Sequence, residues 1–342
     1  MLADTVLVVM WLGLMCYALF AGADFGAGLW DLVAGGSRRG RPQRALIEHA
    51  IGPVWEANHV WLIFVLVMLW SAFPEVFAAV MSTLYLPLTL TALGIIARGA
   101  AFAFRKASTE LWQQRLFGGC FATSSVITPF FLGAVAGGVA SGRVPSGLAA
   151  GSTVTVTSWI NPTSMLGGVL AVVTCAHLAA VYLCADAARG GGPELVRAFR
   201  LRALVSGLVA GGVALVGIAV LDADAPRLFH GLTHRALPLV VLSAVAGVAG
   251  LLLLLRSLWG WARAAAALAV ALILWAWGVA QYPLVLEPDL TVARAAAPPS
   301  VLAAVLIVFL AGALLLIPSL GWLYTLFQHP KTGAAAGAEE AR

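Results

Sequence analysis

The chain has 342 residues, of which 61% are hydrophobic and only 10% are charged, and its formal net charge is +5. A soluble domain carries about 25% charged residues, so the composition excludes a pair of soluble domains and predicts a protein embedded in a lipid bilayer. The small, scattered positive charge also excludes a nucleic-acid-binding protein.

Apolar runs long enough to cross a bilayer follow one another along the chain. No basic residue precedes Arg38, so the positive start of a cleavable signal peptide is missing and we expect the first run to remain as a span. We expect about nine spans, at residues 5–33, 53–73, 75–104, 116–140, 161–187, 201–221, 236–256, 258–281 and 299–328. The sequence therefore predicts an all-α polytopic membrane protein, with one membrane domain over residues 1–330, no convincing strands, and a disordered tail at 331–342.

Lys and Arg gather on alternate loops, which predicts the orientation in the membrane. Clusters follow the first, third and fifth spans, whereas the opposite loops hold only Arg143, Arg227, Arg235 and Arg294. The positive-inside rule then places the N-terminus outside and the C-terminus in the cytoplasm. Trp259 and Trp277 lie at the two ends of the eighth span, about 27 Å apart in a helix, as expected for aromatic residues at both membrane surfaces.

Ionisable residues within spans are costly and deserve a functional hypothesis. Asp24 and Glu56 lie at similar depth, roughly 14 Å and 9 Å of helix from the cytoplasmic ends of their spans. Trp55, Asn58 and His59 lie on adjoining helical faces beside Glu56. Such a cluster can hold water and relay protons, or it can be a buried polar group that only fixes helix packing.

Two further basic side chains have competing interpretations. Arg98, at the cytoplasmic end of the third span, could neutralise Asp24 or Glu56, but we favour an anchor at phospholipid head groups. His177, midway through the fifth span, lacks a partner histidine at matching depth, so we expect no haem and no metal ion to be bound by this chain alone. All four cysteines fall in apolar runs without a CxxC motif, and we interpret them as packing residues.

No nucleotide-binding, hydrolase or zinc-protease motif is present, so catalysis requires a partner or a transport cycle. One hypothesis is a stand-alone proton-coupled secondary transporter in which Asp24 and Glu56 bind the protons. A second hypothesis is a binding or structural membrane protein without proton transport.

A third hypothesis rests on two motifs, AGADFGAG at residues 21–28 and IGPVWEANHVWLI at residues 51–63.

These motifs resemble the DGFDxGxG and PxW[DE]xNxVWL motifs of subunit II of cytochrome bd-type quinol oxidases. Later segments are similar to the same family in order along the chain: Asn161-Pro162, Gln281-Tyr282-Pro283 and Ala295 to Pro298. Gln281-Tyr282-Pro283 resembles the cyanide-insensitive branch. One departure is Ala21, which stands where much of the family has Asp, so only Asp24 carries over in the first motif.

The resemblance implies two four-helix units, at 1–140 and 161–281, a peripheral helix at 299–328, and pairing with a subunit I of similar fold in a bacterial cell membrane. Subunit I would hold two b-type haems and one d-type haem, oxidise quinol near the outer face and reduce oxygen to water. Some members also hold a structural quinone or a small accessory subunit. Subunit II would supply part of the cytoplasmic proton pathway, with Glu56 at the family's acidic position, Asp24 as a second acid, and Trp55, Asn58, His59 and Arg98 in support.

Overall fold

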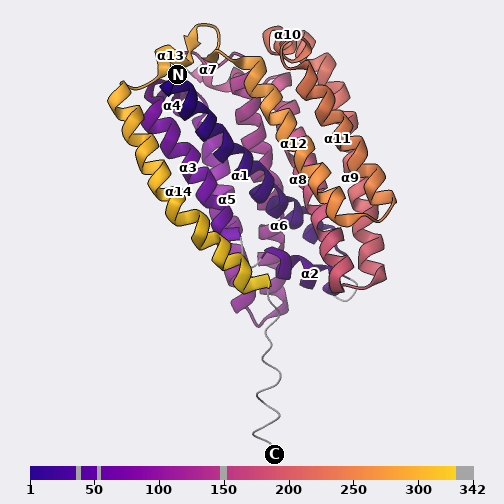
Figure 1. The fold of residues 1–342 in the computed structure, drawn as a ribbon. Helices are drawn as coiled ribbons and strands as arrows, with labels where there is room; N and C mark the ends of the chain where they lie inside the picture. The colour runs from indigo at the N-terminus through magenta and orange to yellow at the C-terminus, as the bar shows by residue number, and fades with distance from the viewer. Residues whose placement is uncertain (36–39, 52–54, 147–151, 329–342) are drawn as a thin grey trace, which may run out of the picture.

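The structure, a computed structural model, describes residues 1–35, 40–51, 55–146 and 152–328. Long helices run side by side through most of it (Figure 1). The elements are α1 (Leu2–Leu32), α2 (Arg41–Ile51), α3 (Trp55–Ala72), α4 (Pro74–Thr83), α5 (Tyr85–Ala107), α6 (Leu111–Ala140), α7 (Ser152–Thr157), α8 (Pro162–Gly190), α9 (Pro193–Asp224), α10 (Pro226–Thr233), α11 (Leu237–Leu255), α12 (Trp259–Gln281), β1 (Leu284–Leu286), β2 (Leu290–Thr291), α13 (Val292–Ala295) and α14 (Pro299–Gln328).

Eight of the described helices are long and apolar enough to cross a membrane, namely α1, α5, α6, α8, α9, α11, α12 and α14. The pair α3 and α4, bent by 118° at its break, supplies a ninth span if it is counted as one. The prediction of an all-α polytopic protein is therefore confirmed.

The predicted span at 75–104 is wrong in its first third. Residues 74–83 form the separate helix α4, and the crossing helix α5 begins only at Tyr85. Pro74 is the cause, because proline has no N–H to continue α3 and it disfavours the helical conformation at the preceding Phe73, whose φ and ψ are −135° and 61°. Phe73 and Leu84, on either side of α4, are fully buried and hold the short helix against the rest of the chain.

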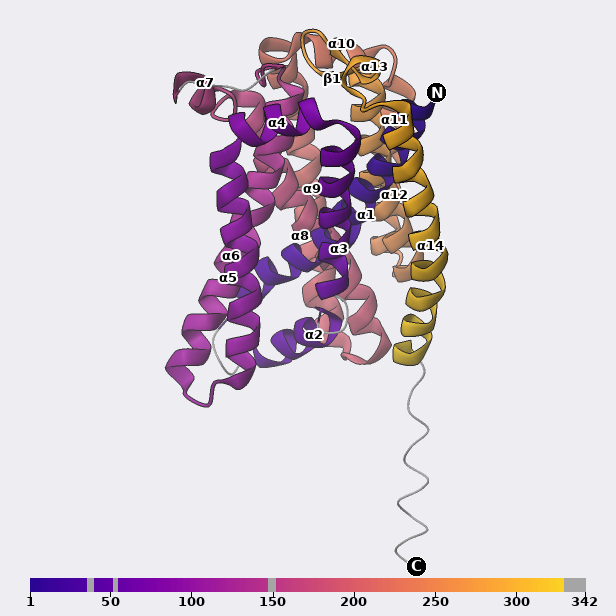
Figure 2. The same ribbon diagram turned by 90° about the vertical axis from the view of Figure 1, so that its left-hand side faces the viewer.

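The two ends of the molecule differ. The start of α1 lies with α4, α7, α10, α13 and the β1–β2 hairpin at one end, called here the hairpin end (Figures 1 and 2). Helix α2 lies at the opposite end, called the α2 end, where α14 also finishes. The start of the first span and the end of the last span thus lie at opposite ends of the bundle, as an odd number of spans requires. The orientation in the membrane stays a prediction.

The short hairpin contradicts the expectation that strands are lacking. β1 and β2 pair antiparallel directly after α12. Gln281 joins helix and hairpin, because its side chain accepts a hydrogen bond from Trp277 Nε1 (2.7 Å) and donates one to the Val285 carbonyl (2.8 Å). The Ala297 amide, beyond the hairpin, donates to the carbonyl of Ala72 at the end of α3 (2.8 Å). Gln281 and Ala297, which belong to the later segments that resemble the family, therefore have a structural role at the hairpin end.

Asp224 ties three helices together at the hairpin end. Arg143, just beyond α6, donates to both Asp224 oxygens, at 2.9 and 2.6 Å. Thr163, in the first turn of α8, donates its amide and hydroxyl to the same carboxylate at 3.0 and 2.6 Å. Asn161 begins α8 as its N-cap by accepting from the Ser164 amide. The ends of α6, α8 and α9 are thereby fixed relative to one another.

Helix α1 runs through the middle of the bundle and packs against α3, α6 and α8 (Figures 1 and 2). Helix α14 lies along α1 and α3 at the edge, with most of its described side chains exposed. That position agrees with the peripheral helix implied by the resemblance. The division into units at 1–140 and 161–281 stays a prediction.

Candidate functional site

Glycines in α1 let the interior of the bundle close around Asp24. A Cβ atom at Gly26 would overlap the backbone carbonyl of Cys175 in α8, and one at Gly28 would overlap the Ser125 side chain in α6. Only glycine allows α1 to approach the α8 backbone and the Ser125 side chain so closely. The motif at residues 21–28 therefore brings α1 into direct contact with two neighbouring helices at the level of its acid.

Asp24 and Asn58 bring the two sequence motifs together. The Asn58 amide, in the first turns of α3, donates a hydrogen bond to Oδ2 of Asp24 in α1. Both side chains are buried, with 8% and 5% of their surface exposed. The hydrogen bond therefore joins the two motifs inside the bundle, while the similar depth of Asp24 and Glu56 stays a prediction.

Arg98 is buried beside this pair, with only 2% of its surface exposed. Its Nη2 donates to the backbone carbonyl of Asp24, and its Nε donates to the Ser125 hydroxyl, both at 2.9 Å. The guanidinium also lies over the rings of Phe25 and Phe121, 5.0 and 4.9 Å from their centroids. The preferred interpretation of Arg98 as a head-group anchor is wrong. Because α5 continues to Ala107, Arg98 lies more than two turns inside the helix end.

His59 and Tyr17 continue the polar surroundings of Asp24. The His59 ring lies 6.1 Å from the Phe25 ring and 6.3 Å from the Tyr17 ring, measured between centroids. The buried Tyr17 hydroxyl has no hydrogen-bond partner among the described residues. The side chains of Trp55 and Glu56 lie outside the described residues, although both belong to α3, two or three positions before Asn58.

Asp31 is a buried acid that our sequence interpretation missed, because it lies at the end of the first span. It is 5% exposed and pairs with Arg105 of α5 at 2.7 Å and with Arg44 of α2 at 3.2 Å. Arg105 also pairs with Glu48 of α2 at 3.0 Å. The sequence signal was its spacing of seven residues from Asp24, which puts both acids on one face of α1.

Asp24, Asn58, Arg98 and His59 are called here the Asp24 cluster. His177 faces away from it. Its Nδ1 lies 3.0 Å from the carbonyl oxygen of Ala203 in α9, and the absent side chain of Gly207 leaves room for the ring. Within the described ranges, no three His, Cys, Asp or Glu side chains gather as a metal site would require.

The four cysteines are free, and they differ in exposure. Cys175 and Cys184 are buried packing residues, as predicted, and Cys16 is half-buried. Cys120 is exposed on the surface of α6, so it does not pack inside this chain.

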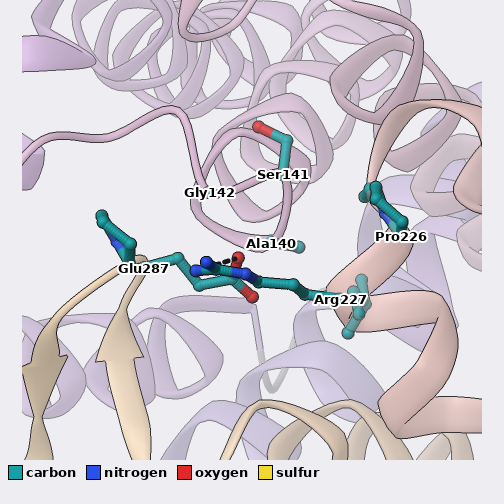
Figure 3. A pocket seen from close by; sticks show the side chains of 9 residues that line it. Ala140, Ser141, Gly142, Pro226, Arg227 and Glu287 are labelled. Atoms are coloured by element: carbon teal, nitrogen blue, oxygen red, sulfur yellow. Dashed lines mark ion pairs between the residues drawn. The ribbon is translucent and has the colours of Figure 1, made fainter.

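A pocket of about 290 Å³ lies at the hairpin end, far from Asp24, and Figure 3 shows Arg227 and Glu287 facing each other in it. The Arg227 Nη1 and Glu287 Oε2 atoms are 3.8 Å apart. Burial raises the pKa of the Glu287 carboxyl, and the charge of Arg227 partly offsets this rise. The pocket shares no residue with the Asp24 cluster, so we place the candidate site at Asp24.

Comparison with known proteins identifies the family. The model of the family described as cytochrome bd terminal oxidase subunit II matches residues 2–327. The chain belongs to this family. The motif at residues 51–63 and the buried Asp24 are therefore features of a cytochrome bd subunit II.

Individual relatives agree with this assignment. The chain is 29% identical to the cytochrome bd ubiquinol oxidase subunit 2 of Bacillus subtilis (strain 168), over 66% of this chain and 64% of that protein. It is 28% identical to the cytochrome bd-I ubiquinol oxidase subunit 2 of Escherichia coli (strain K12), over 50% of this chain and 45% of the relative. The matched region thus spans less than two thirds of the length of either relative. The solved bd oxidase from Geobacillus thermodenitrificans contains a chain of the same fold, with a TM-score of 0.76, 26% identity, and coverage of 96% of this chain and 98% of that one.

Proposed function

We propose that this chain is the haem-free subunit of a bacterial membrane quinol oxidase and supplies part of the route that carries protons to the oxygen-reducing site. Its partner is a subunit I that holds the haems and oxidises quinol, and the α2 end faces the cytoplasm. Membership of the family supports the oxidase, and the names of the relatives support a quinol as the electron donor. A structural quinone and a small accessory subunit stay expectations from the resemblance.

The observation that carries the proton route is the hydrogen bond from Asn58 to Asp24 inside the bundle. An acid at this position is costly unless it is compensated, and Arg98 supplies a positive charge nearby. Asn58 occupies one carboxylate oxygen of Asp24, which leaves Oδ1 to accept a proton. Glu56, two residues before Asn58 in α3, is the second proton carrier in this proposal.

Each side chain has a distinct role in the proposed route. Asp24 and Glu56 take up and release protons, and His59 helps to hold water beside them. Asn58 and Arg98 are positioning residues, since they orient and compensate the carboxylate. Oxygen reduction itself consumes one proton for each electron, and the haems of subunit I supply that redox chemistry when they are bound.

A stand-alone proton-coupled transporter would use the same two acids. An oxidase subunit and a stand-alone transporter can be distinguished by the proteins and haems that co-purify with the chain. We expect the tagged chain to co-purify with a second membrane subunit, and the complex to show haem absorption and quinol-dependent oxygen consumption. A colourless preparation that transports a solute would contradict the oxidase function.

A further inference from the structure

Two histidines lie together at the hairpin end, outside the proposed proton route. His230 belongs to α10, and His234 follows the last residue of that helix as its C-cap. Both side chains are exposed, and their ring centroids are 3.9 Å apart with an angle of 32° between the ring planes. A spacing of four residues puts both imidazoles on one face of a helix.

The hydrogen bonds of His234 fix which ring nitrogen carries the proton. Its Nδ1 lies 3.0 Å from the carbonyl oxygen of His230 and 3.1 Å from the hydroxyl oxygen of Thr233. The carbonyl can only accept, and the Thr233 hydroxyl already donates to the Phe229 carbonyl at 2.8 Å. Nδ1 must therefore be the donor, which leaves the lone pair of Nε2 directed away from the backbone.

This arrangement is the one found around metal-binding imidazoles. A histidine that binds a metal through Nε2 commonly donates Nδ1–H to a backbone carbonyl, which fixes the tautomer and the orientation of the ring. Two imidazole nitrogens on one tetrahedral ion, each about 2.0–2.1 Å from it, lie about 3.3 Å apart. The two rings, with centroids 3.9 Å apart, are partly stacked, and because His230 is exposed its side chain is free to rotate, open the stack and bring one nitrogen of each ring to that separation.

We propose that His230 and His234 form a binding site for a divalent transition-metal ion such as Zn²⁺ or Cu²⁺. Imidazole nitrogen suits these ions, whereas Mg²⁺ and Ca²⁺ require oxygen ligands. The described residues supply two protein ligands, and water completes the coordination, so the ion is exchangeable.

The neighbouring charges set a limit on the affinity. Arg227 lies one turn before His230, and its guanidinium points toward Glu287. Arg235, next to His234, donates to the carbonyls of Tyr282 and Ala280 at the end of α12. The positive charges of both arginines repel a cation. Glu287 holds the Arg227 guanidinium, and the two carbonyls hold that of Arg235. The site therefore binds more weakly than a closed structural zinc site with four ligands.

The test uses the purified complex that contains the full chain and adds Cu²⁺ alone. With one equivalent of Cu²⁺ per complex, we expect the electron paramagnetic resonance spectrum to show the copper coupled to two nitrogen nuclei. In His230→Ala and in His234→Ala, the coupling falls to one nitrogen or disappears, and the dissociation constant rises by about tenfold or more. The matched control is His49→Ala, which removes an exposed histidine of α2 at the opposite end.

Each result decides the proposal. Loss of the two-nitrogen signal in both variants, with His49→Ala unchanged, supports the site. An unchanged signal in either variant, an equal loss in the control, or no Cu²⁺ binding by the original complex overturns it. Haem absorption and oxygen consumption are recorded for every variant, because neither histidine belongs to the proton route and both properties should stay normal. Failure of the metal site would therefore leave the proposed oxidase function untouched.

Discussion

The contact between α1 and α8 at Gly26 yields a prediction with a matched control one turn away. A Cβ atom at Gly26 would overlap the Cys175 carbonyl and come within 2.8 Å of the Ala179 Cβ, about 1 Å closer than an ordinary carbon contact. At Gly22 the same atom would lie 3.5 Å from the Cys175 sulfur and 3.7 Å from Leu178 Cδ1, which is normal contact. The two glycines therefore differ in tolerance of a single methyl group.

The magnitudes follow from two opposing effects. Replacing glycine by alanine in a helix gains up to about 1 kcal/mol, whereas overpacking costs about 1–3 kcal/mol and more when backbone must move. We expect Gly22→Ala to be neutral or slightly stabilising. At Gly26 the backbone of α8 must move, so Gly26→Ala should lose about 2 kcal/mol or more and separate α1 from α8.

The assay is thermal unfolding of the assembled complex, followed by loss of haem absorption, together with oxygen consumption. Gly26→Ala should unfold at lower temperature and consume oxygen more slowly, because Asp24 lies only two residues away and moves with α1. Gly22→Ala should match the original protein in both measurements. Equal unfolding temperatures and equal rates for the two variants would refute the reasoning about this contact.

Three further predictions concern the two ends of the bundle. Asp31→Asn removes the acid that holds two arginines at the α2 end, and it should lower the unfolding temperature by an amount equivalent to about 1–3 kcal/mol; an unchanged temperature would show that the arginines find other partners. Asp224→Asn weakens the bidentate pair with Arg143, so it should destabilise the hairpin end, seen as faster amide exchange in the first turn of α8; unchanged exchange there would contradict the role of Asp224. Single cysteines at Arg41 and Asp289, in a background without the native cysteines, should react with a membrane-impermeant maleimide from the cytoplasmic and outer sides respectively; reaction of both from one side would end the nine-span topology.

The crossing helices could be predicted from the sequence because each must present about 20 apolar residues to lipid. The limits of α12 show how well this works, since the structure begins it at Trp259 and ends it at Gln281, one residue from the predicted start and at the predicted end. The helix α2 was not predicted. Its amphipathic sequence, with Arg44 and Glu48 on the polar side, is too short and too polar to register as a span.

The site was predictable only in part, because burial depends on neighbours distant in the sequence. Counting residues along their spans predicted similar depths for Asp24 and Glu56 and placed Asn58 beside Glu56, and the structure brings Asn58 to Asp24. Arg98 could not be placed, since its burial depends on Phe25, Phe121 and Ser125 from other helices. Asp31 was missed for the same reason, because an acid near a helix end looks exposed until α2 and α5 are seen to cover it.

The most direct test of the proton route is the oxygen-reduction rate and proton uptake of Glu56→Gln in the assembled complex. Glutamine keeps the shape and hydrogen-bonding capacity of glutamate but cannot titrate, so we expect normal haem content and loss of most of the rate, with more activity retained in Glu56→Asp. Glu75→Gln is the matched control, because Glu75 is an exposed acid in the first turn of α4 and should leave the rate unchanged. Full turnover and normal proton uptake in a correctly assembled Glu56→Gln complex would remove Glu56 from the route.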